Sequence, residues 1–470
     1  MPPYLAATSK RMISKFLKRG MALALASVVV THAAVALPDQ SDKRPRGPSI
    51  IRDAEIEGLL RIYAAPIFRA AGINIKAARV VVIGEPTINA FVADGQRIFV
   101  NSGLITRAPD PNTVMGVLAH ESGHIAGGHL AKMNSALKEA STEAIVGTLF
   151  GIAAVVGASV AGNNEAARAG TGVIFGAQAS AQRGLLVYQR GMEATADESA
   201  MRYLEATHNS ARGMLTLFRI LANESLASTT GSDPYAYSHP LPFDRLRALE
   251  ATAQASVYFN KPDDPALVLR HKLAQAKLTG YLEPQQVFVK FPSTDHSAAS
   301  RYARAIAFFR RGDLASSMPL IDSLTRDMPS NPYFWELKAQ AYLENGKPRE
   351  GLPAIVKARS ILPNNALLEI LHAQILLGSE SAASADQAIA ILKQARREEP
   401  GEVEIYKFLA QAYGLKNDVA QAELATAEFA FATGDTRLAS EKAVRAKKYL
   451  KQGSPEWYRA SDIENSTAKK

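Results

Sequence analysis

Apolar positions return about once per helical turn in the first part of the chain. From about Ile50 to Gly72 they fall on one face of a helix, and they are Ile51, Ile56, Leu59, Leu60 and Tyr63. Spacing of three to four residues is typical of an amphipathic helix whose apolar stripe faces a core. The pattern therefore predicts a helix from about Ile50 to Gly72.

Shorter, β-branched runs follow this helix. Val80 to Ile83 is one such run, and two further extended pieces, Ile88 to Val92 and Ile98 to Val100, flank Asp94-Gly95. Asp-Gly between two such runs is a strong hairpin signal, because both residues accept the positive φ of a tight turn. A small β-hairpin or sheet is predicted here.

Helical patterns then dominate the first half of the chain. Asp110-Pro111 supplies an N-cap and a proline at the first helical position. Further helices are predicted from about Leu185 to Ala206 and from Arg212 to Ala222. The predicted fold class is α+β and mostly α, with a first domain that closes near Pro262.

Beyond about Ser300 the sequence pattern changes to alanine-rich helix pairs with a period near 34 residues. The landmarks that recur at one or two such steps are Gln340-Ala341-Tyr342 with Gln411-Ala412-Tyr413, Gly312 with Gly346, and Pro329, Pro363 and Pro400. Steps of this length are typical of tetratricopeptide repeats, which stack into a solenoid.

The N-terminus has the order of a secretory signal peptide. Five basic residues precede the apolar run Met21 to Val30 and the small-residue site Ala34-Val35-Ala36. Cleavage is predicted after Ala36, and an uncleaved membrane anchor is the alternative. The chain has no cysteine, which fits an exported bacterial protein of the periplasm and restricts any metal ligands to His and carboxylates.

Composition narrows the class of protein further. The 470 residues suffice for two folded units, and 47% hydrophobic with 21% charged residues is ordinary for globular proteins. The net charge of +9 includes five positive charges before Ala36, which leaves +4 for the rest. Nucleic-acid binding is not expected from so small an excess.

One uncharged, apolar stretch runs from Ala144 to Ala161. Its length reaches the lower bound for a transmembrane helix, but its glycines and small residues weaken that interpretation. Three alternatives stay open: a membrane span, a loop that touches lipid, and a buried helix pair. A peripheral membrane contact through the Gly/Ala-rich segment from Ala144 to Ala179 belongs to the second alternative.

The segment His120-Glu121-Ser122-Gly123-His124 carries the chemistry. On a helix, His120 and His124 lie on one face and can bind one metal ion, for which zinc is favoured, while Glu121 points alongside. Catalytic zinc needs three protein ligands and an open position for water, whose proton a neighbouring carboxylate accepts. Glu121 is the candidate base, and the third ligand must come from elsewhere.

The third ligand separates two classes of metallopeptidase. A metzincin would have histidine where this chain has Leu130, and His129 is one residue short, after a Gly127-Gly128 pair that is expected to end or bend the helix. His129 is therefore expected behind the ligands or on the surface. Glu193 from a second helix is the predicted ligand, and Asp197, one turn on, can accept a hydrogen bond from a ligand histidine.

A second polar cluster is His239-Pro240 followed by Arg245. Near an open zinc site, such side chains can stabilise the oxyanion of a tetrahedral intermediate, or His239 can occupy the open position and keep the enzyme latent. A His-Pro turn that merely caps a helix is the structural alternative. The predicted hairpin also offers an edge strand that could align an extended peptide by backbone pairing.

Together these residues resemble the gluzincin peptidases that include the heat-shock protease HtpX and the CAAX prenyl endopeptidases. The resemblance is carried by Asn89-Ala90-Phe91, His120 to His124, Arg190-Gly191-Met192-Glu193, Ala196-Asp197, His239-Pro240 and Arg245. It implies one zinc ion per chain held by His120, His124 and Glu193, with Glu121 as the base.

The same resemblance implies that His239 and Arg245 line the site as catalytic residues. Asn89, Ala90 and Phe91 are the corresponding candidates for substrate binding. With the leader and the repeats, the resemblance extends to envelope members of the family. It implies a periplasmic zinc endopeptidase in quality control of outer-membrane proteins, which degrades misfolded or misassembled barrel proteins or assists their assembly.

These expectations define the organisation of the chain. The predicted parts are a signal peptide at 1–36, a metallopeptidase domain at 37–262, a connecting helix and linker at 263–299, a tetratricopeptide-like repeat domain at 300–460 and a disordered tail at 461–470. The repeats are expected to recruit unfolded substrates or the outer-membrane barrel assembly machinery. The alternatives are a chaperone or scaffold with a latent protease site, and a membrane-embedded protease.

Overall fold

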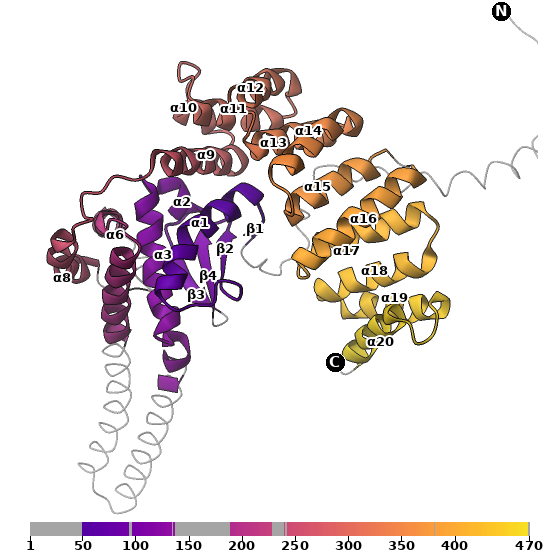
Figure 1. Cartoon of the computed structure of the whole chain (residues 1–470), viewed down its shortest axis with the longest axis horizontal. Helices are drawn as coiled ribbons and strands as arrows, with labels where there is room; N and C mark the ends of the chain where they lie inside the picture. Colours follow the sequence, from indigo (N-terminus) through magenta and orange to yellow (C-terminus); the bar gives the residue numbers. More distant parts are fainter. Residues whose placement is uncertain are drawn as a thin grey trace, which may run out of the picture. The chain divides into compact units, whose positions relative to one another are not determined.

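The computed structural model describes residues 49–93, 96–133, 135–136, 189–227, 239, 242–379 and 381–468 (Figure 1). The predicted signal peptide, the Asp94-Gly95 turn and the apolar segment from Ala144 to Ala179 lie outside these residues. No helix of the described ranges is both long enough and apolar enough to cross a membrane. The fold is α+β and mostly α-helical, as predicted.

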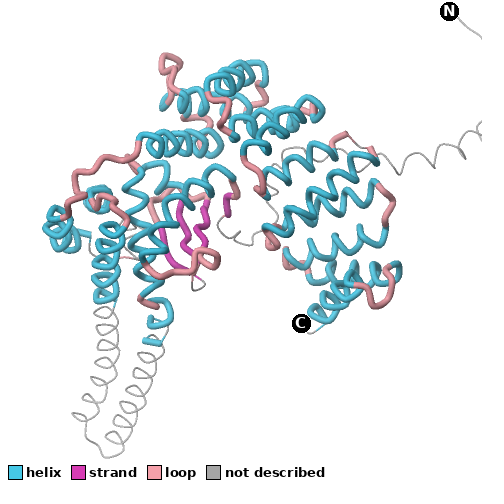
Figure 2. Tube along the Cα trace, in the orientation of Figure 1, coloured by secondary structure: helices cyan, strands magenta, loops and turns pink. Residues whose placement is uncertain are grey.

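A four-stranded sheet lies in the first half of the chain, in the order β1-β2-β4-β3 (Figure 2). β3 (Ala90–Ala93) pairs antiparallel with β4 (Arg97–Asn101), which confirms the predicted strand pair. β2 (Arg79–Ile83) pairs parallel with β4, and β1 (Ile50–Ile51) pairs antiparallel with β2. β3 therefore forms one edge of the sheet.

The first helix begins later than predicted. α1 spans Ala54–Ala70, and the carboxylate of Asp53 caps it by accepting hydrogen bonds of 3.0 and 2.9 Å from the N–H groups two and three residues further on. Ile50 and Ile51 instead belong to β1, so the predicted start at Ile50 was wrong. Apolar spacing alone does not distinguish a helix turn from a short strand beside it.

The helix with the His-Glu segment, α3 (Pro111–Ala126), begins where the sequence predicts. Oδ1 of Asp110 accepts a hydrogen bond of 2.8 Å from the N–H of Thr113, and Pro111 occupies the first helical position. α3 packs against α1, β3 and α6, and its residues are buried as far as Gly123. A helix enclosed in this way holds its side chains in fixed directions.

The remaining elements of the first half complete one hydrophobic core. They are α2 (Ser102–Arg107), a helix at residues 189–206, α6 (Arg212–Ala227) and α8 (Pro242–Ala255). The core joins the inner face of the sheet to these helices through fully buried side chains such as Ile98, Leu118, Leu204 and Phe218. The predicted helix from Leu185 to Ala206 is described from residue 189 onward.

Helix pairs make up the second half, shown from salmon through orange to yellow in Figure 1. They are α11 (Ala298–Arg310) with α12 (Leu314–Asp327), α13 (Pro332–Glu344) with α14 (Pro348–Ile361), α15 (Ala366–Leu377) with α16 (Ala382–Glu398), α17 (Val403–Leu415) with α18 (Val419–Ala432), and α19 (Thr436–Tyr449) with α20 (Pro455–Ala468). Each pair packs on the next. Gly312 lies between α11 and α12, and Gly346 lies at the equivalent place between α13 and α14.

One predicted boundary differs from the structure. Residues 461–468 were expected to be disordered, but they form the end of α20, because Ala460, Ser461 and Ile463 are buried against α18 and α19. α9 (Pro265–Leu282) and the short α10 (Val287–Lys290) lie in the predicted connecting region. α9 does more than connect, since it buries residues in the cores of both halves.

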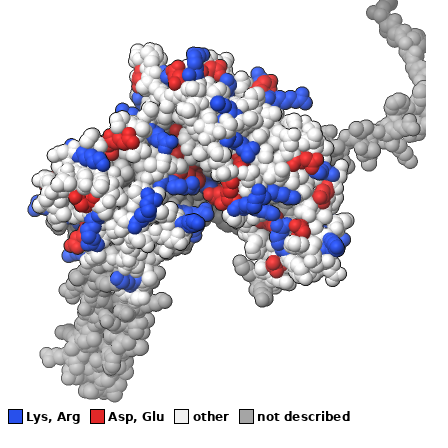
Figure 3. Space-filling view, in the orientation of Figure 1, with Lys and Arg blue, Asp and Glu red and all other residues white. Residues whose placement is uncertain are grey.

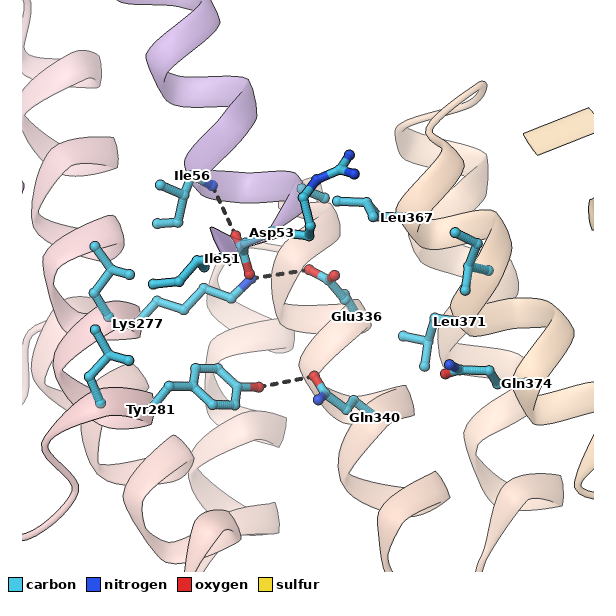
Figure 4. A pocket seen from close by; sticks show the side chains of 15 residues that line it. Ile51, Asp53, Ile56, Lys277, Tyr281, Glu336, Gln340, Leu367, Leu371 and Gln374 are labelled. Carbon is cyan, nitrogen blue, oxygen red and sulfur yellow. Dashed lines mark hydrogen bonds and ion pairs between the residues drawn. The ribbon is translucent and has the colours of Figure 1, made fainter. Parts of the chain in front are cut away.

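Lys277 on α9 sits in a buried ion cluster where the two halves meet (Figure 4). Its Nζ lies 2.7 Å from Oδ2 of Asp53 and 3.3 Å from Oε2 of Glu336 on α13. Burial opposes its charge, but these carboxylates raise the pKa of Lys277 well above its usual value. Below it, the hydroxyl of Tyr281 donates a 2.9 Å hydrogen bond to Gln340 at the wall of a cavity of about 430 Å³.

A second contact between the halves involves the loop between α16 and α17. Arg52 pairs with Glu402 and with Glu399 at 3.3 Å, and Arg79 of β2 also lies 3.3 Å from Glu399. Basic and acidic side chains are intermixed on the face drawn in Figure 3. The peptidase half and the helix pairs are thus joined by both buried and exposed ion pairs.

Candidate metal centre

Two helices bring most of the predicted site residues together. α3 carries His120, Glu121 and His124, and the helix at 189–206 carries Glu193 and Asp197. These two helices approach closely at Gly123, where a Cβ atom would lie 2.8 Å from the carbonyl oxygen of Ala196. A glycine inside the His-Glu segment therefore allows the second helix to place its carboxylates beside the histidines.

Four donors converge on one point. His120, His124, Glu193 and His239 each offer one ligand atom, and these atoms all lie within 4.8 Å of one another. Nε2 of His120 is 3.0 Å from Nε2 of His124, and Oε1 of Glu193 is 3.3 Å from Nε2 of His124. The first three donors are the ones that the sequence predicts, whereas it leaves the place of His239 open.

The donor set fits a zinc ion. Bonds of 2.0 to 2.1 Å in a tetrahedron place the ligand atoms about 3.3 Å apart. Nε2 of His120 lies 3.4 Å from Oε2 of Glu193 and 3.4 Å from Nδ1 of His239. Nδ1 of His239 lies 3.0 Å from both carboxylate oxygens of Glu193. These five separations are close to the edges of such a tetrahedron, and imidazole with carboxylate is a common zinc ligand set.

Asp197 and Arg245 support the donors from behind. Nδ1 of His120 lies 2.9 Å from Oδ1 of Asp197, as predicted from the one-turn spacing. Arg245 donates two hydrogen bonds of 2.7 Å to Asp197, and its Nη1 lies 2.9 Å from Oε2 of Glu193. Its guanidinium group also lies over the ring of Phe218, 4.7 Å from the centroid. Arg245 therefore contacts the two carboxylates and is itself fixed.

The electrostatics of the cluster favour a bound cation. Burial opposes ionisation of Glu193, but hydrogen bonds from His120, His124 and His239 hold its pKa well below the usual value. Burial likewise opposes charge on His120, yet its hydrogen bonds to Asp197 and Glu193 raise its pKa to about 9. Burial lowers the pKa of His124 to about 3, so this ring is neutral and keeps a lone pair for a metal.

Glu121 stands apart from the other carboxylates. Both of its oxygens are buried, and neither has a hydrogen-bond partner among the residues that the structure describes. Nε2 of His239 lies 3.5 Å from its Oε1. Burial raises the pKa of Glu121. Burying a carboxylate without a hydrogen bond costs free energy, and such carboxylates are concentrated at functional sites.

The predicted substrate strand runs past the donors. The carbonyl oxygen of Ala90, on β3, lies 3.3 Å from Nε2 of His239. The carbonyl of Asn89 accepts a 2.9 Å hydrogen bond from the N–H of Asn101, and Phe91 stacks on Phe99 with centroids 5.4 Å apart. No further strand of the described ranges pairs with the outer edge of β3. Within the described part of the chain, that edge of β3 is therefore open to pairing with a peptide.

The fold and the site define the protein as a zinc metallopeptidase. Residues 53–253 match peptidase family M48, so the chain carries an M48 peptidase domain. This match spans β2, β3, β4, α3 and every donor of the cluster. It also confirms the zinc dependence that the histidine and glutamate set indicates.

Curated relatives cover more of the chain than this domain. The chain is 23% identical over 339 residues to the putative beta-barrel assembly-enhancing protease of Vibrio cholerae serotype O1, which covers 70% of this chain and 67% of that protein. It is 22% identical over 380 residues to the beta-barrel assembly-enhancing protease of Escherichia coli K12, with 79% and 74% covered. The protein of the same name from Yersinia pestis is 22% identical, with 70% and 66% covered.

Proposed function

We propose that this chain is a periplasmic zinc endopeptidase that hydrolyses misfolded or misassembled outer-membrane proteins. The observation that carries the catalytic part is Glu121, a buried carboxylate without a hydrogen-bond partner in the described residues, whose Oε1 lies 3.5 Å from Nε2 of the donor His239. The relatives are named for β-barrel assembly, which supports the outer-membrane part. The predicted signal peptide supports export.

The proposed roles follow from the contacts. His120, His124 and Glu193 hold the zinc, which when bound lowers the pKa of a water and polarises a peptide carbonyl. Glu121 accepts the proton of the attacking water and can return it to the leaving amine. Asp197 keeps His120 in position through a contact of 2.9 Å, and Arg245 keeps Glu193 in position through another contact of 2.9 Å. Arg245 is therefore proposed as a positioning residue rather than an oxyanion donor.

Substrate alignment is proposed for β3. An extended peptide that pairs with the outer edge of Ala90–Ala93 gains backbone hydrogen bonds that do not depend on its side chains. Broad side-chain preference of this kind suits an enzyme that acts on unfolded chains. Asn89, Ala90 and Phe91 retain their proposed place as the substrate strand.

His239 is proposed to keep the site latent in the conformation described. Its Nδ1 completes the tetrahedron of donors, at 3.0 Å from Glu193 and 3.4 Å from His120, so it competes with water for the fourth position. Its Nε2 faces both Glu121 and the carbonyl of Ala90. His239 thus takes the water position and also contacts the base and the edge strand. It must move before a peptide is cut.

The helix pairs from α11 to α20 are proposed as a tetratricopeptide-like recruitment domain, which follows a peptidase domain at 37–262. Stacked helix pairs offer a groove for peptides or partner helices. The proposed ligands are unfolded substrates or the outer-membrane barrel assembly machinery. A peripheral contact with a membrane is proposed for the segment from Ala144 to Ala179.

One experiment separates protease from scaffold. A urea-unfolded barrel protein is incubated with the wild type or with Glu121→Gln, and fragments and folded barrel are followed on the same gel. The proposal expects fragments with the wild type alone. Equal fragmentation by the two proteins would contradict Glu121 as the base. Accelerated barrel folding without fragments by either protein would favour the scaffold.

A further inference from the structure

The two ligand histidines of α3 differ in what holds their second ring nitrogen. Nδ1 of His120 is fixed by the carboxylate of Asp197 at 2.9 Å. Nδ1 of His124 instead faces another histidine, His129, whose own Nδ1 lies 3.0 Å away. The two rings meet edge to face, with centroids 4.9 Å apart and planes at 83°. Ligand histidines depend on such a partner to fix the tautomer and the ring orientation.

We propose that His129 is a positioning residue of the zinc site, which fixes the ring of His124 by accepting a hydrogen bond from its Nδ1. This inference rests on the proposed zinc site. His129 is not one of the four converging donors, and it acts through His124. His129 thus orients His124 in the way that Asp197 orients His120.

The backbone between these two histidines is shaped for this contact. α3 ends at Ala126, and Gly128 has a φ of +62°, a left-handed conformation that residues with a Cβ rarely adopt. This turn folds the chain back, so that the ring of His129 lies under the end of α3. A Cβ atom on Gly127 would lie 2.3 Å from Nε2 of His129. Both glycines of the pair are thus required by the position of the ring.

The chemistry of the two rings fixes the direction of the hydrogen bond. Nε2 of His124 points at Glu193 and at its fellow ligand, so it must carry a lone pair to bind a cation. A neutral ring then carries its proton on Nδ1. Only one proton fits between two nitrogens 3.0 Å apart, so His129 accepts with Nδ1. His129 is 5% exposed, which keeps water from replacing it.

Three substitutions in the full chain test the inference. His129→Leu fills most of the space and removes the acceptor, whereas His129→Asn returns an oxygen near the place of Nδ1. Gly127→Ala leaves His129 intact but forces its ring to move, and the φ of −74° at Gly127 accommodates alanine without backbone strain. His296→Leu, at an exposed histidine outside the site, is the control.

Zinc affinity, measured by competition with a chromogenic chelator, is the main readout. The visible spectrum of the cobalt-substituted protein reports ligand geometry, and the melting temperature of the metal-free protein reports folding. We expect His129→Leu and Gly127→Ala to bind zinc about 10- to 100-fold more weakly than the wild type and to change the cobalt spectrum. His129→Asn is expected to restore most of the affinity, and His296→Leu to bind as the wild type does.

The outcomes distinguish this inference from the proposed function. A wild type that binds no zinc would overturn the metal site itself. A wild type that binds zinc, with His129→Leu within about twofold of it, would overturn the positioning role alone. Equal weakening by the Leu and Asn variants would also overturn it, since a general packing defect would then explain both. If His129→Leu unfolds the metal-free protein, Gly127→Ala with a normal melting temperature decides by the same criterion.

Discussion

Replacing Lys277 by methionine tests how the peptidase half and the helix pairs are held together. Lys277→Met keeps the aliphatic stem and removes the charge from a side chain that is 5% exposed. Its Nζ lies 2.7 Å from Asp53, 3.3 Å from Glu336 and 3.6 Å from Glu55. One buried carboxylate, Glu55, and two half-buried ones would lose their only close cation of this cluster among the described residues.

The expected loss is large for a single residue. Removing one partner of a buried ion pair costs about 3 to 5 kcal/mol, because the other partner stays buried without compensation. Burial raises the pKa of Glu55 to about 7 even with Lys277 nearby, so this carboxylate is already costly to ionise near neutral pH. We therefore expect the free energy of unfolding at pH 8 to fall by about 3 kcal/mol or more.

Urea unfolding of the full chain, followed by circular dichroism, measures this free energy. Lys407→Met is the matched control, because Lys407 also pairs with a glutamate at 2.9 Å but its side chain is 52% exposed. Exposed pairs contribute at most about 1 kcal/mol. The double variant Lys277→Met/Glu336→Gln should recover part of the loss, since it removes one uncompensated carboxylate. A loss in Lys277→Met no larger than that in Lys407→Met would refute the reasoning.

Three further predictions concern the site, the pH dependence and the packing. His239→Ala is expected to speed hydrolysis of an unfolded protein, because it vacates the fourth position, and a slower variant would contradict the latent role. Burial lowers the pKa of His271 from its usual 6.5, so the stability gained from its neutral ring is complete above pH 6.5 and is lost as the pH falls below that value. Between pH 7.5 and 5.5, His271→Gln should therefore lose less free energy of unfolding than the wild type, as measured by urea unfolding. Gly103→Ala would place a Cβ 2.1 Å from the carbonyl oxygen of Pro86 and should lower the melting temperature, whereas Gly191→Ala, in an open helical position, should leave it unchanged or raise it.

Local signals predicted the elements that carry the site. Asp110 and Pro111 define where α3 begins, and the pair Gly127-Gly128 defines where it ends, because caps and glycines act within a few residues. The one-turn spacing of Glu193 and Asp197 likewise places both carboxylates on one face of their helix. These positions need no knowledge of the rest of the fold.

Long-range pairing accounts for what the sequence left open or misplaced. Ile50 and Ile51 read as the start of a helix, but their strand pairing with β2 decides otherwise. The parallel pairing of β2 with β4 is a register between segments that no local pattern encodes. The position of His239 depends in the same way on contacts with Glu193 and Ala90, two elements far away in the chain. Periodicity reports which face of an element is apolar, not what covers it.

The central claim is that a zinc ion in this donor set and Glu121 together hydrolyse unfolded outer-membrane proteins. The most direct test follows cleavage of an unfolded barrel protein by the wild type and by Glu121→Gln, before zinc removal, after it and after zinc return. We predict one zinc per chain in both proteins, with cleavage by the wild type alone that stops on zinc removal and resumes on its return. Cleavage that survives zinc removal, or equal cleavage by the two proteins, would contradict the claim.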